Sequence, residues 1–557
     1  MVAHERLLAS EGAGMTNVAT AVIELLAEAG VRHVFGVPSG PWAPYMEAMR
    51  TGPVEYVLTS TEAAAGFMAT VCGMLTGHPG ACYGTYGPGA TNLCTGVGTA
   101  FLDRAPVLAF TTEAPERMRH RTLQMHIDHQ ALFRPLTKWT TRLQAANLRQ
   151  TLRRAVQVAT AEVPGPVHLG LPEDLGPQPA VPEAGTVHMQ RGQPAPAPTA
   201  EQLHALASHL RQARRPLLVL GLSCLRATGW DALQRFIERQ RLPVVLTPMA
   251  KGFVREDHAS YVGVLFHALS NIVAETIQEA DMVLAIGYDP VEFNYEDWLT
   301  QVPLLHVDTV PADIDATCHL ALEVLGDIGT VLRFLATLPA LPHTWDLAAI
   351  GERRQRLFST FTAPRQTLSP SQVLGAIQEL LPAEGFLTCD VGAHTHLIGQ
   401  AWRTSAPGHL VLTNGWSSMG FGIPAALATK LCHPERQVVC VTGDGGFLMM
   451  VGEMATAVRL GLSVVFVVLV DRHLQLITYK QEHQGFPCYG TPLFPAAYPP
   501  PSHYFGVPVT TVRTVAEVHD ALAQGLQATG PVIIEALVDP AEYEHLILRP
   551  HKLGTQA

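Results

Sequence analysis

Two carboxylates, Asp444 and Asp471, each come directly after an apolar run rich in β-branched residues. The runs occupy 437–442 and 463–470, and the stretch 445–461 between them has the pattern of a helix that ends at a glycine. A strand, a helix and a second strand in this order predict a βαβ unit with parallel strands. Parallel strands end at the same edge of a sheet, where neighbours are about 4.8 Å apart. We therefore expect the two carboxylates to be close enough to share one divalent cation.

Glycines surround the first of these acids, at Gly443, Gly445 and Gly446. Glycine lets the backbone approach a ligand closely, and the N–H groups at the start of the next helix attract anions. Acids that bind a hard cation, beside amides that bind phosphate, are typical of a Mg²⁺–diphosphate site. Asp and Gly are also ordinary turn residues, so the Gly-Asp-Gly triplet alone is compatible with a plain turn. The second acid, which follows the next strand, favours the diphosphate site.

The elements that must position these acids recur along the whole chain. Its 557 residues are too many for a single core and indicate about three domains. Short strands alternate with helical segments and Gly- or Pro-containing turns, which predicts an α/β fold of three doubly wound parallel-sheet domains. A Pro- and Ala-rich stretch at 190–200 is typical of a linker. The predicted segments are an N-terminal extension at 1–14 and domains at 15–185, 200–338 and 366–557.

The composition argues against several classes of function. The net charge is −11 and no basic run occurs, which disfavours a nucleic-acid partner. No apolar run reaches the roughly 18 residues of a membrane-spanning helix, and the first residues lack a secretory signal pattern. The nine cysteines form no CxxC pair and most have apolar neighbours, which predicts buried, reduced thiols. We therefore expect a cytoplasmic protein with no membrane and no nucleic-acid partner.

The Gly-Asp-Gly triplet with a second acid 27 positions after its Asp resembles the cofactor-binding motif of thiamine diphosphate enzymes. The resemblance covers nearly the whole chain and is closest to the acetolactate synthase group, with benzaldehyde lyase a near relative. It implies that Asp444 and Asp471 bind Mg²⁺ by their side chains and His473 by its backbone carbonyl, with Leu474 beside the cofactor. The family usually has Asn where this chain has Asp471, and we expect the added charge to affect affinity and metal preference.

The same resemblance names the three domains, in chain order, as pyrimidine-binding, central and diphosphate-binding. Thiamine chemistry requires an acid that hydrogen-bonds the pyrimidine ring and promotes loss of the reactive proton. Glu62 follows a strand, opens an Ala-rich helix and matches the family's activating glutamate. From the residues alone, Glu62 also suits a helix start capped by Ser60 or Thr61. The family often has His at the position of Thr61.

A stretch at 414–426 resembles the segment that bends the cofactor in this family. The resemblance implies that Met419 is the apolar wedge between the two cofactor rings. It also implies that the backbone carbonyl of Ser417 accepts a hydrogen bond from the cofactor's amine. Met419 as an ordinary core residue is the alternative interpretation.

A stretch at 389–397 resembles the diphosphate loop of the family. The implied contacts are the backbone at Gly392 and Ala393 and the side chain of His394. A metal site formed by His394 and His396 is an alternative, for which the sequence offers no evident third ligand.

Two longer stretches, 86–117 and 126–139, resemble the acetolactate synthase group, and Gln124 matches a glutamine that contacts substrate in benzaldehyde lyase. The resemblance implies decarboxylation of a 2-keto acid, with pyruvate the expected substrate, and carboligation of the acyl unit to a second carbonyl. The stretch 285–298 resembles catabolic, flavin-free acetolactate synthases, so FAD is not expected.

Substrate contacts are inferred from the same resemblance. Gly40 and Trp42 would form an apolar wall at the reacting carbon, with Leu476 and Ile477 on the opposite side. Lys480 would pair with a substrate carboxylate, although it also suits a solvated helix position. These residues point to small-molecule 2-keto acid or aldehyde substrates.

Three hypotheses follow for the function. The first is a thiamine diphosphate- and Mg²⁺-dependent carboligase or lyase of the acetolactate synthase type. The second is a lyase or carboligase for larger 2-hydroxy ketones or aldehydes, like benzaldehyde lyase, which the apolar region at Trp42 favours. The third is a non-catalytic binding protein, against which Glu62 argues. The family also implies a homodimer or homotetramer with active sites at the subunit interface. A proline-rich segment at 491–507 is expected to be a stiff covering loop.

Overall fold

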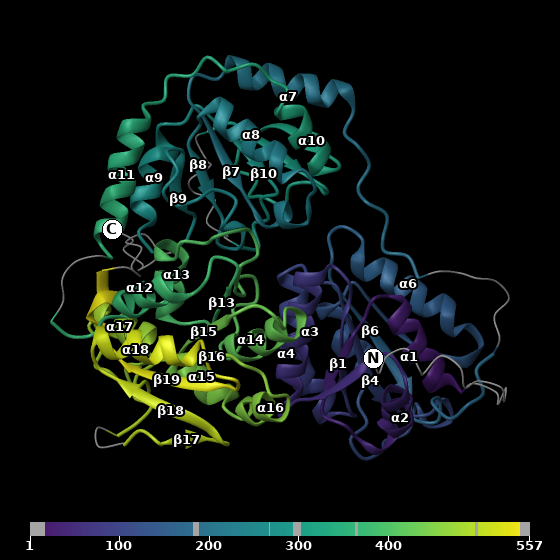
Figure 1. Ribbon diagram of the computed structural model, residues 1–557. Helices are drawn as coiled ribbons and strands as arrows, with labels where there is room; N and C mark the ends of the chain where they lie inside the picture. The colour runs from purple at the N-terminus through teal and green to yellow at the C-terminus, as the bar shows by residue number, and fades with distance from the viewer. Residues whose placement is uncertain are drawn as a thin grey trace. The chain divides into compact units, whose positions relative to one another are not determined.

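The described part of the computed structural model contains three α/β domains, each built on its own sheet. The chain divides into two compact units, Met1–Gln193 and Pro194–Ala557, which Figure 1 colours from purple to blue and from blue through teal to yellow. The extension predicted at 1–14 and part of the stretch 285–298 lie outside the described residues. The structure describes residues 17–181, 189–266, 268–292, 302–361, 366–495 and 499–545.

The first unit contains a parallel sheet with strand order β2-β1-β3-β4-β6-β5. Helices α1, α2 and α6 share a buried core with the sheet, and α3 and α4 pack closely against each other. The strands are β1 (His33–Gly36), β2 (Glu55–Leu58), β3 (Gly80–Gly84), β4 (Val107–Glu113), β5 (Trp139–Arg142) and β6 (Pro166–Pro172). The helices are α1 (Val18–Glu28), α2 (Ala43–Thr51), α3 (Glu62–Thr76), α4 (Pro88–Leu102), α5 (His129–Phe133) and α6 (Leu148–Thr160).

The contact between α3 and α4 depends on two glycines. A Cβ added at Gly96 would lie 2.4 Å from the Cα of Gly66, so the two backbones touch. Only residues without a side chain allow helices to approach so closely. This contact sets the start of α3, where Glu62 lies, relative to α4.

The second unit begins with a parallel sheet of order β12-β11-β10-β7-β8-β9. Its apolar core is formed by residues of the sheet and of the helices that cover it. The strands are β7 (Pro216–Leu220), β8 (Val244–Leu246), β9 (Tyr261–Val264), β10 (Met282–Ile286), β11 (Leu304–Asp308) and β12 (Leu320–Leu325). The helices are α7 (Ala200–Gln212), α8 (Trp230–Gln240), α9 (Ser270–Gln278), α10 (Ile328–Leu335) and α11 (Leu347–Ser359).

The third sheet has the order β14-β13-β15-β16-β19-β18-β17 and is parallel except for the pair β17–β18. Ser369 caps α12 and Pro370 is its first residue, the positions that these two residue types favour at a helix start. The strands are β13 (Phe386–Cys389), β14 (Leu410–Val411), β15 (Val438–Gly443), β16 (Val465–Val470), β17 (His503–Tyr504), β18 (Val507–Val512) and β19 (Val532–Leu537). The helices are α12 (Pro370–Leu380), α13 (Ala393–Ala401), α14 (Gly422–Cys432), α15 (Asp444–Met450), α16 (Glu453–Arg459), α17 (Gln475–His483) and α18 (Val515–Gly525).

The predicted fold class, three doubly wound parallel-sheet α/β domains, is confirmed. Every strand of a sheet falls inside one of the predicted ranges, while the domain boundaries themselves stay predictions. One element differs from its prediction. The helix expected over 445–461 is two short helices, α15 and α16, with Val451 and Gly452 between them. Glycine in a helix interior has a high conformational entropy cost, which explains an interruption at this point.

All nine cysteines lie within the described residues and are free, and five of them are buried. Cys488 is exposed, so the prediction of buried thiols holds for most but not all of them. No described helix is both long enough and apolar enough to cross a membrane.

Candidate functional site

The acid pair lies at one edge of the third sheet. Strands β15 and β16 are parallel neighbours, with Gly443 paired to Leu469 at the end of the register. Asp444 is the next residue after β15, and Asp471 is the next residue after β16. Both carboxylates therefore follow the carboxyl ends of adjacent strands, the edge at which ligands bind in open parallel sheets.

Backbone amides orient the two carboxylates. Asp444 Oδ1 accepts a hydrogen bond from the Gly445 N–H at 2.9 Å, and its Oδ2 accepts one from the Arg472 N–H at 2.7 Å. Asp471 Oδ1 accepts from the His473 N–H at 3.0 Å. Each acid therefore keeps lone pairs for a cation after its backbone contacts are made.

The pair carries an electrostatic penalty that a cation would remove. Burial raises the pKa of Asp444 to about 6. Burial, together with the nearby charge of Asp444, raises the pKa of Asp471 to about 8. Two acids that oppose each other's ionisation are stabilised by a shared positive ion. The donor set, oxygen atoms only, is the kind that Mg²⁺ prefers.

An open cavity lies beside the acid pair. Most of the cofactor residues predicted from the sequence for this domain line it. The predicted residues at the cavity are Gly392, Ala393, His394, Met419, Gly443, Asp444, Gly445, Gly446, Asp471, His473, Leu474, Leu476 and Ile477. Val391, Leu469, Gln475 and Tyr543 complete the lining.

His394 brings an unsatisfied polar atom to this cavity. Its side chain is 4% exposed, and Nε2 has no hydrogen-bond partner among the described residues. Burial lowers the pKa of the imidazole to about 4, so the ring is neutral at physiological pH. A buried polar atom without a partner costs free energy, which a hydrogen-bonding ligand in the cavity would recover. This observation fits the predicted diphosphate contact.

The start of α13 offers fewer free amides than the sequence suggests. The Gly392 N–H donates to Thr395 Oγ1 at 2.9 Å and is therefore used within the loop. The alternative metal pair of His394 and His396 finds no third ligand in the part of the chain that the structure describes. The ring of His396 instead packs against Phe266, with 4.8 Å between the ring centroids.

Asp390 is a residue of this site that the sequence analysis did not single out. Its Oδ1 accepts hydrogen bonds from the N–H groups of Val391 at 2.6 Å and Gly420 at 2.8 Å, and its Oδ2 accepts from Thr442 Oγ1 at 3.1 Å. A Cβ added at Gly446 would lie 2.5 Å from Asp390 Oδ2, so this position also requires glycine. Asp390 thus ties the start of α13 to Gly420 and to the end of strand β15, next to the lining residues Met419 and Gly443. The available signal was its place directly after strand β13, which matches the place of Asp444 after β15.

Two other segments complete the surroundings of the acid pair. Residues 491–493 run beside 472–474: the Leu474 N–H donates to the Thr491 carbonyl at 2.9 Å, and the Leu493 N–H donates to the Arg472 carbonyl at 2.8 Å. The first residues of the proline-rich segment thus pack against the loop that carries His473. Tyr543, near the end of the described chain, is fully buried at the cavity.

Ser417 and Lys480 are not among the residues that line the cavity. Ser417 has a left-handed backbone conformation, with φ of 52°, and its Oγ donates to the Asn414 carbonyl at 2.7 Å. Lys480 is an exposed residue of α17, which agrees with the solvated alternative. The roles assigned to these two residues stay predictions.

In the first unit, Glu62 is the first residue of α3 and is 7% exposed. Thr61 Oγ1 accepts from the Ala64 N–H at 3.2 Å, so the helix cap considered above is present. Asn92 Nδ2 donates to Glu62 Oε2 at 3.2 Å, and a Cβ added at Gly89 would lie 3.1 Å from Glu62 Oε1. The carboxylate is therefore held against the first turn of α4 rather than left in solvent.

The remaining predicted residues of the first unit differ in their surroundings. Gln124 is exposed on the segment between β4 and α5, and Gly40 is exposed before α2. Trp42 is 1% exposed and stacks on Tyr83 and Tyr45, with ring centroids 4.0 and 4.8 Å apart. Its indole packs in the core of this unit, and its role at the substrate stays a prediction.

Comparison with known proteins agrees with this site. Residues 16–132, 203–335 and 390–536 match the N-terminal, central and C-terminal domains of the thiamine pyrophosphate enzymes. An acetolactate synthase large subunit from Parasynechococcus marenigrum is 31% identical over 97% of this chain and 90% of its own length. The acetolactate synthase of Bacillus subtilis is 29% identical, with 93% and 92% covered. A catabolic acetolactate synthase from Raoultella terrigena is 26% identical, with 93% and 94% covered.

These relatives bear on two expectations. They include a large subunit as well as a catabolic enzyme, so they do not support the expectation that FAD is not used. The domain matches follow the order of the three sheets, and the matches to acetolactate synthases extend over nearly the whole chain. The chain therefore belongs to the thiamine pyrophosphate enzymes and is an enzyme of the acetolactate synthase type.

Proposed function

We propose that this protein decarboxylates a 2-keto acid, with pyruvate as the substrate, and joins the acyl unit to a second carbonyl, using thiamine diphosphate and Mg²⁺. The observation that carries the proposal is the acid pair, Asp444 and Asp471, at one cavity with the unsatisfied Nε2 of His394. Bound thiamine diphosphate supplies a carbon nucleophile for the keto carbonyl and accepts the electron pair released when carbon dioxide leaves.

The chain's own residues have separate tasks in this proposal. Asp444, Asp471 and the carbonyl of His473 hold the Mg²⁺ ion, which neutralises the diphosphate and the two acids together. Met419, which lies half-buried at the cavity, holds the cofactor in its bent form. Glu62 hydrogen-bonds the pyrimidine ring and thereby promotes removal of the reactive proton.

We further propose a homodimer or homotetramer in which Glu62 of one subunit completes the cavity of another. Support comes from exposed apolar side chains: Ile477, which lines the cavity, is 44% exposed, and Met449 and Leu448, on the helix that begins with Asp444, are 54% and 39% exposed. Neighbouring exposed apolar residues are typical of subunit interfaces.

Complementation between two inactive variants tests this assembly. Equal amounts of Glu62→Gln and Asp444→Asn subunits, unfolded and refolded together, should regain about a quarter of the wild-type activity, because half of the dimers are mixed and one of their two sites is intact. Each variant refolded alone is the control. No activity in the mixture, with mixed dimers shown by a tag on one subunit, would mean that the site lies within one subunit.

A second candidate function has one observation in its favour. Among the described residues that line the cavity, none is Lys or Arg, and Met419, Leu469, Leu474, Leu476 and Ile477 make much of it apolar. Such a lining suits an aldehyde or a larger 2-hydroxy ketone better than a small carboxylate.

A substrate panel separates the two candidates. The purified protein with thiamine diphosphate and Mg²⁺ is offered pyruvate alone, larger 2-keto acids, and benzaldehyde or acetoin, and the products are identified by mass. Acetolactate from pyruvate alone supports the first proposal. Turnover of aldehydes or 2-hydroxy ketones with none of pyruvate supports the second, and no turnover of any of them contradicts both. The visible absorbance of the purified protein shows whether FAD is bound.

A further inference from the structure

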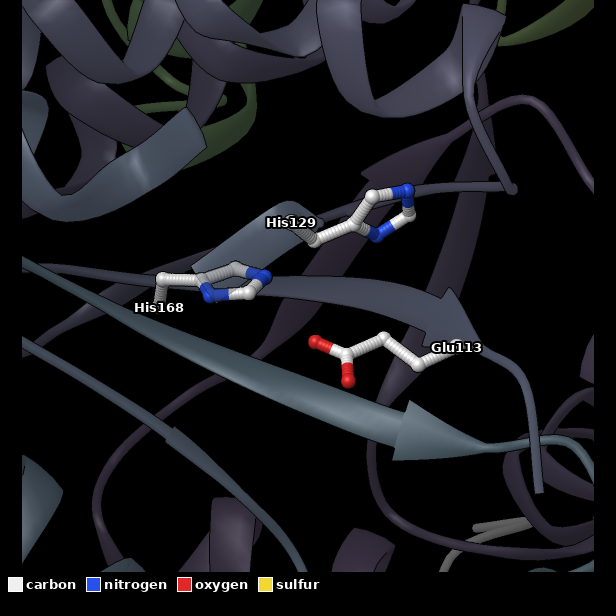
Figure 2. A group of neighbouring side chains, drawn as sticks. All are labelled: Glu113, His129 and His168. Carbon is white, nitrogen blue, oxygen red and sulfur yellow. The ribbon is translucent and has the colours of Figure 1, made fainter. Parts of the chain in front are cut away.

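A buried polar cluster in the first unit has no role in the function proposed above. Glu113 ends β4, His168 lies on the neighbouring strand β6, and His129 opens α5. Each offers one potential metal-ligand atom, these atoms lie within 4.8 Å of one another, and all three residues are buried. Figure 2 shows the two imidazoles and the carboxylate gathered around a common space.

The hydrogen bonds in this cluster disfavour a metal ion. Thr111 Oγ1 lies between the two rings, 2.9 Å from His129 Nδ1 and 2.7 Å from His168 Nε2. The guanidinium of Arg142 is 3.0 Å from Glu113 Oε2. A metal ion would have to displace the hydroxyl and sit beside a fixed positive charge, which repels it. The cluster therefore needs another explanation.

The protons can be assigned from one end of the cluster. The Gly87 N–H donates to His129 Nε2 at 3.2 Å, so Nε2 is the acceptor of a neutral ring and Nδ1 carries the proton. Nδ1–H then donates to Thr111 Oγ1, whose own proton goes to His168 Nε2. His168 is therefore protonated at Nδ1, which donates to Thr140 Oγ1 at 2.7 Å.

The other end gives the same assignment independently. Glu113, paired with Arg142, accepts a hydrogen bond from Gln130 Nε2 at 2.6 Å. Gln130 Oε1 must then accept from Thr140 Oγ1, at 2.7 Å. A hydroxyl has one proton to give, so Thr140 can only accept from His168. The two ends agree on the direction of every hydrogen bond between them.

This ordered state requires both imidazoles to be neutral. Burial lowers the pKa of His129 to about 4 and that of His168 well below its ordinary value. His126 and Arg142 also lower the pKa of His129, and Asp128 raises it by less than burial lowers it. Both rings are therefore neutral at the pH of ordinary assays.

The chain of hydrogen bonds ends at a turn that flanks Glu62. Gly87 has φ of 33° and immediately precedes α4, and a Cβ on it would lie 2.6 Å from the Met125 carbonyl oxygen. Two residues later, Gly89 lies against the Glu62 carboxylate, and Asn92 in the next turn donates to it. A shift of the Gly87 turn would therefore move two contacts of Glu62.

We propose that the six hydrogen bonds from Gly87 to Glu113, running through His129, Thr111, His168, Thr140 and Gln130, form a positioning network that fixes the start of α4 and so the carboxylate of Glu62. None of these seven residues needs to touch substrate or cofactor. The proposal rests on the proposed role of Glu62, and it gives a specific task to a cluster that resembles a metal site.

Thr111→Val tests the network at its centre, because valine keeps the shape and removes the hydroxyl. The variant removes both hydrogen bonds of the hydroxyl, so in the cofactor-free protein deuterium uptake by the peptide containing Gly87 should rise by at least about tenfold, the factor expected for one buried hydrogen bond. In the loaded enzyme, exchange of the thiamine C2 proton should slow by a similar factor, with cofactor affinity within about twofold. Thr111→Ser, which restores the hydroxyl, should return both rates toward wild type.

Thr99→Val is the matched control, because Thr99 is also buried in this unit and its hydroxyl donates to the Thr95 carbonyl within α4. It should lower the melting temperature without changing either exchange rate. Unchanged uptake at Gly87 in Thr111→Val, or the same increase in Thr99→Val, would overturn the proposal, as would stoichiometric bound metal that His168→Ala removes. If Glu62→Gln leaves C2 exchange intact, the proposed function fails, while the uptake at Gly87 still reports on the network.

Discussion

The cavity at the third sheet and the cluster in the first unit both contain buried acids and histidines, but these side chains differ in whether they have hydrogen-bond or ion-pair partners. At the cavity, two carboxylates raise each other's cost of ionisation and His394 Nε2 has no described partner. In the cluster, each ring nitrogen of His129 and His168 and the carboxylate of Glu113 has a hydrogen bond or an ion pair. Buried polar groups without hydrogen-bond partners indicate a ligand-binding site, whereas polar groups that hydrogen-bond one another stabilise the local structure.

The largest effect is expected at Glu62, which the hydrogen-bond network of the first unit is proposed to position and which is proposed to activate the cofactor. Glu62→Gln keeps the size of the side chain and removes its acidity, so C2 proton exchange on bound thiamine diphosphate should fall by about a thousandfold, while cofactor affinity changes by no more than about threefold. Exchange is followed by NMR after quenching in deuterated buffer, and affinity by calorimetry.

Glu55→Gln is a matched control, because Glu55 is an exposed acid of the same unit. It should leave both quantities unchanged. Exchange in Glu62→Gln at the wild-type rate would show that Glu62 has no part in activation.

Asp444→Asn should have the next largest effect, and it tests whether the cavity is built for a charged ligand. The family motif keeps an acid at the position of Asp444 but usually has Asn at that of Asp471, so loss of the Asp444 charge should be the more harmful and should weaken Mg²⁺-dependent cofactor binding by about a hundredfold. The metal-free protein should lose little stability: the amide oxygen still accepts from the Arg472 N–H, and the removed repulsion offsets the lost acceptor of the Gly445 N–H.

Glu113→Gln is the corresponding substitution in the cluster of Glu113, His129 and His168, whose polar groups have hydrogen-bond partners. It breaks the buried ion pair with Arg142 and should lower the free energy of unfolding by about 1–3 kcal/mol. Melting temperatures of both variants, measured in a chelating buffer, give the comparison. A large loss of stability in Asp444→Asn would mean that its carboxylate supports the fold rather than a ligand.

A smaller effect is expected where two helices place Glu62. Gly96→Ala puts a Cβ within 2.4 Å of Gly66 Cα, and overpacking of this kind costs about 1–3 kcal/mol of stability. Gly375→Ala in α12 is the control, because nothing lies within 4 Å of the added Cβ and alanine favours a helix by about 0.5–1 kcal/mol. The two variants should shift the melting temperature in opposite directions, and an unchanged melting temperature in Gly96→Ala would show that α3 and α4 can separate without cost.

The features predicted correctly from the sequence depend on residues close together in the chain. Asp444 and Asp471 follow consecutive strands, so the handedness of a βαβ unit was enough to bring them to one edge. The cap at Thr61 is local in the same way. The three-sheet architecture follows from the alternation of strands and helices along the chain.

Features that depend on distant residues were missed. Asp390 joins the segment at Gly420 to Thr442 on strand β15, and Tyr543 lines the cavity from a segment much later in the chain. The stacking of Trp42 on Tyr83, which is 41 positions away, was not predicted either. Such contacts are decided by packing in three dimensions, which the spacing of residues along one segment does not encode.

The smallest effect is expected at Asp471, and it decides why this chain has an acid where the resemblance leads us to expect Asn. Asp471→Asn keeps an oxygen for the metal and removes the charge that Asp444 opposes. Mg²⁺-dependent cofactor binding should therefore change by no more than about threefold, whereas Asp471→Ala should lose about 10–100-fold. Calorimetric titration of Mg²⁺ in the presence of saturating thiamine diphosphate measures both. If Asn loses as much as Ala, the metal needs the second charge and not merely the second oxygen, and the cavity would then be selective for a cation that only two carboxylates can bind.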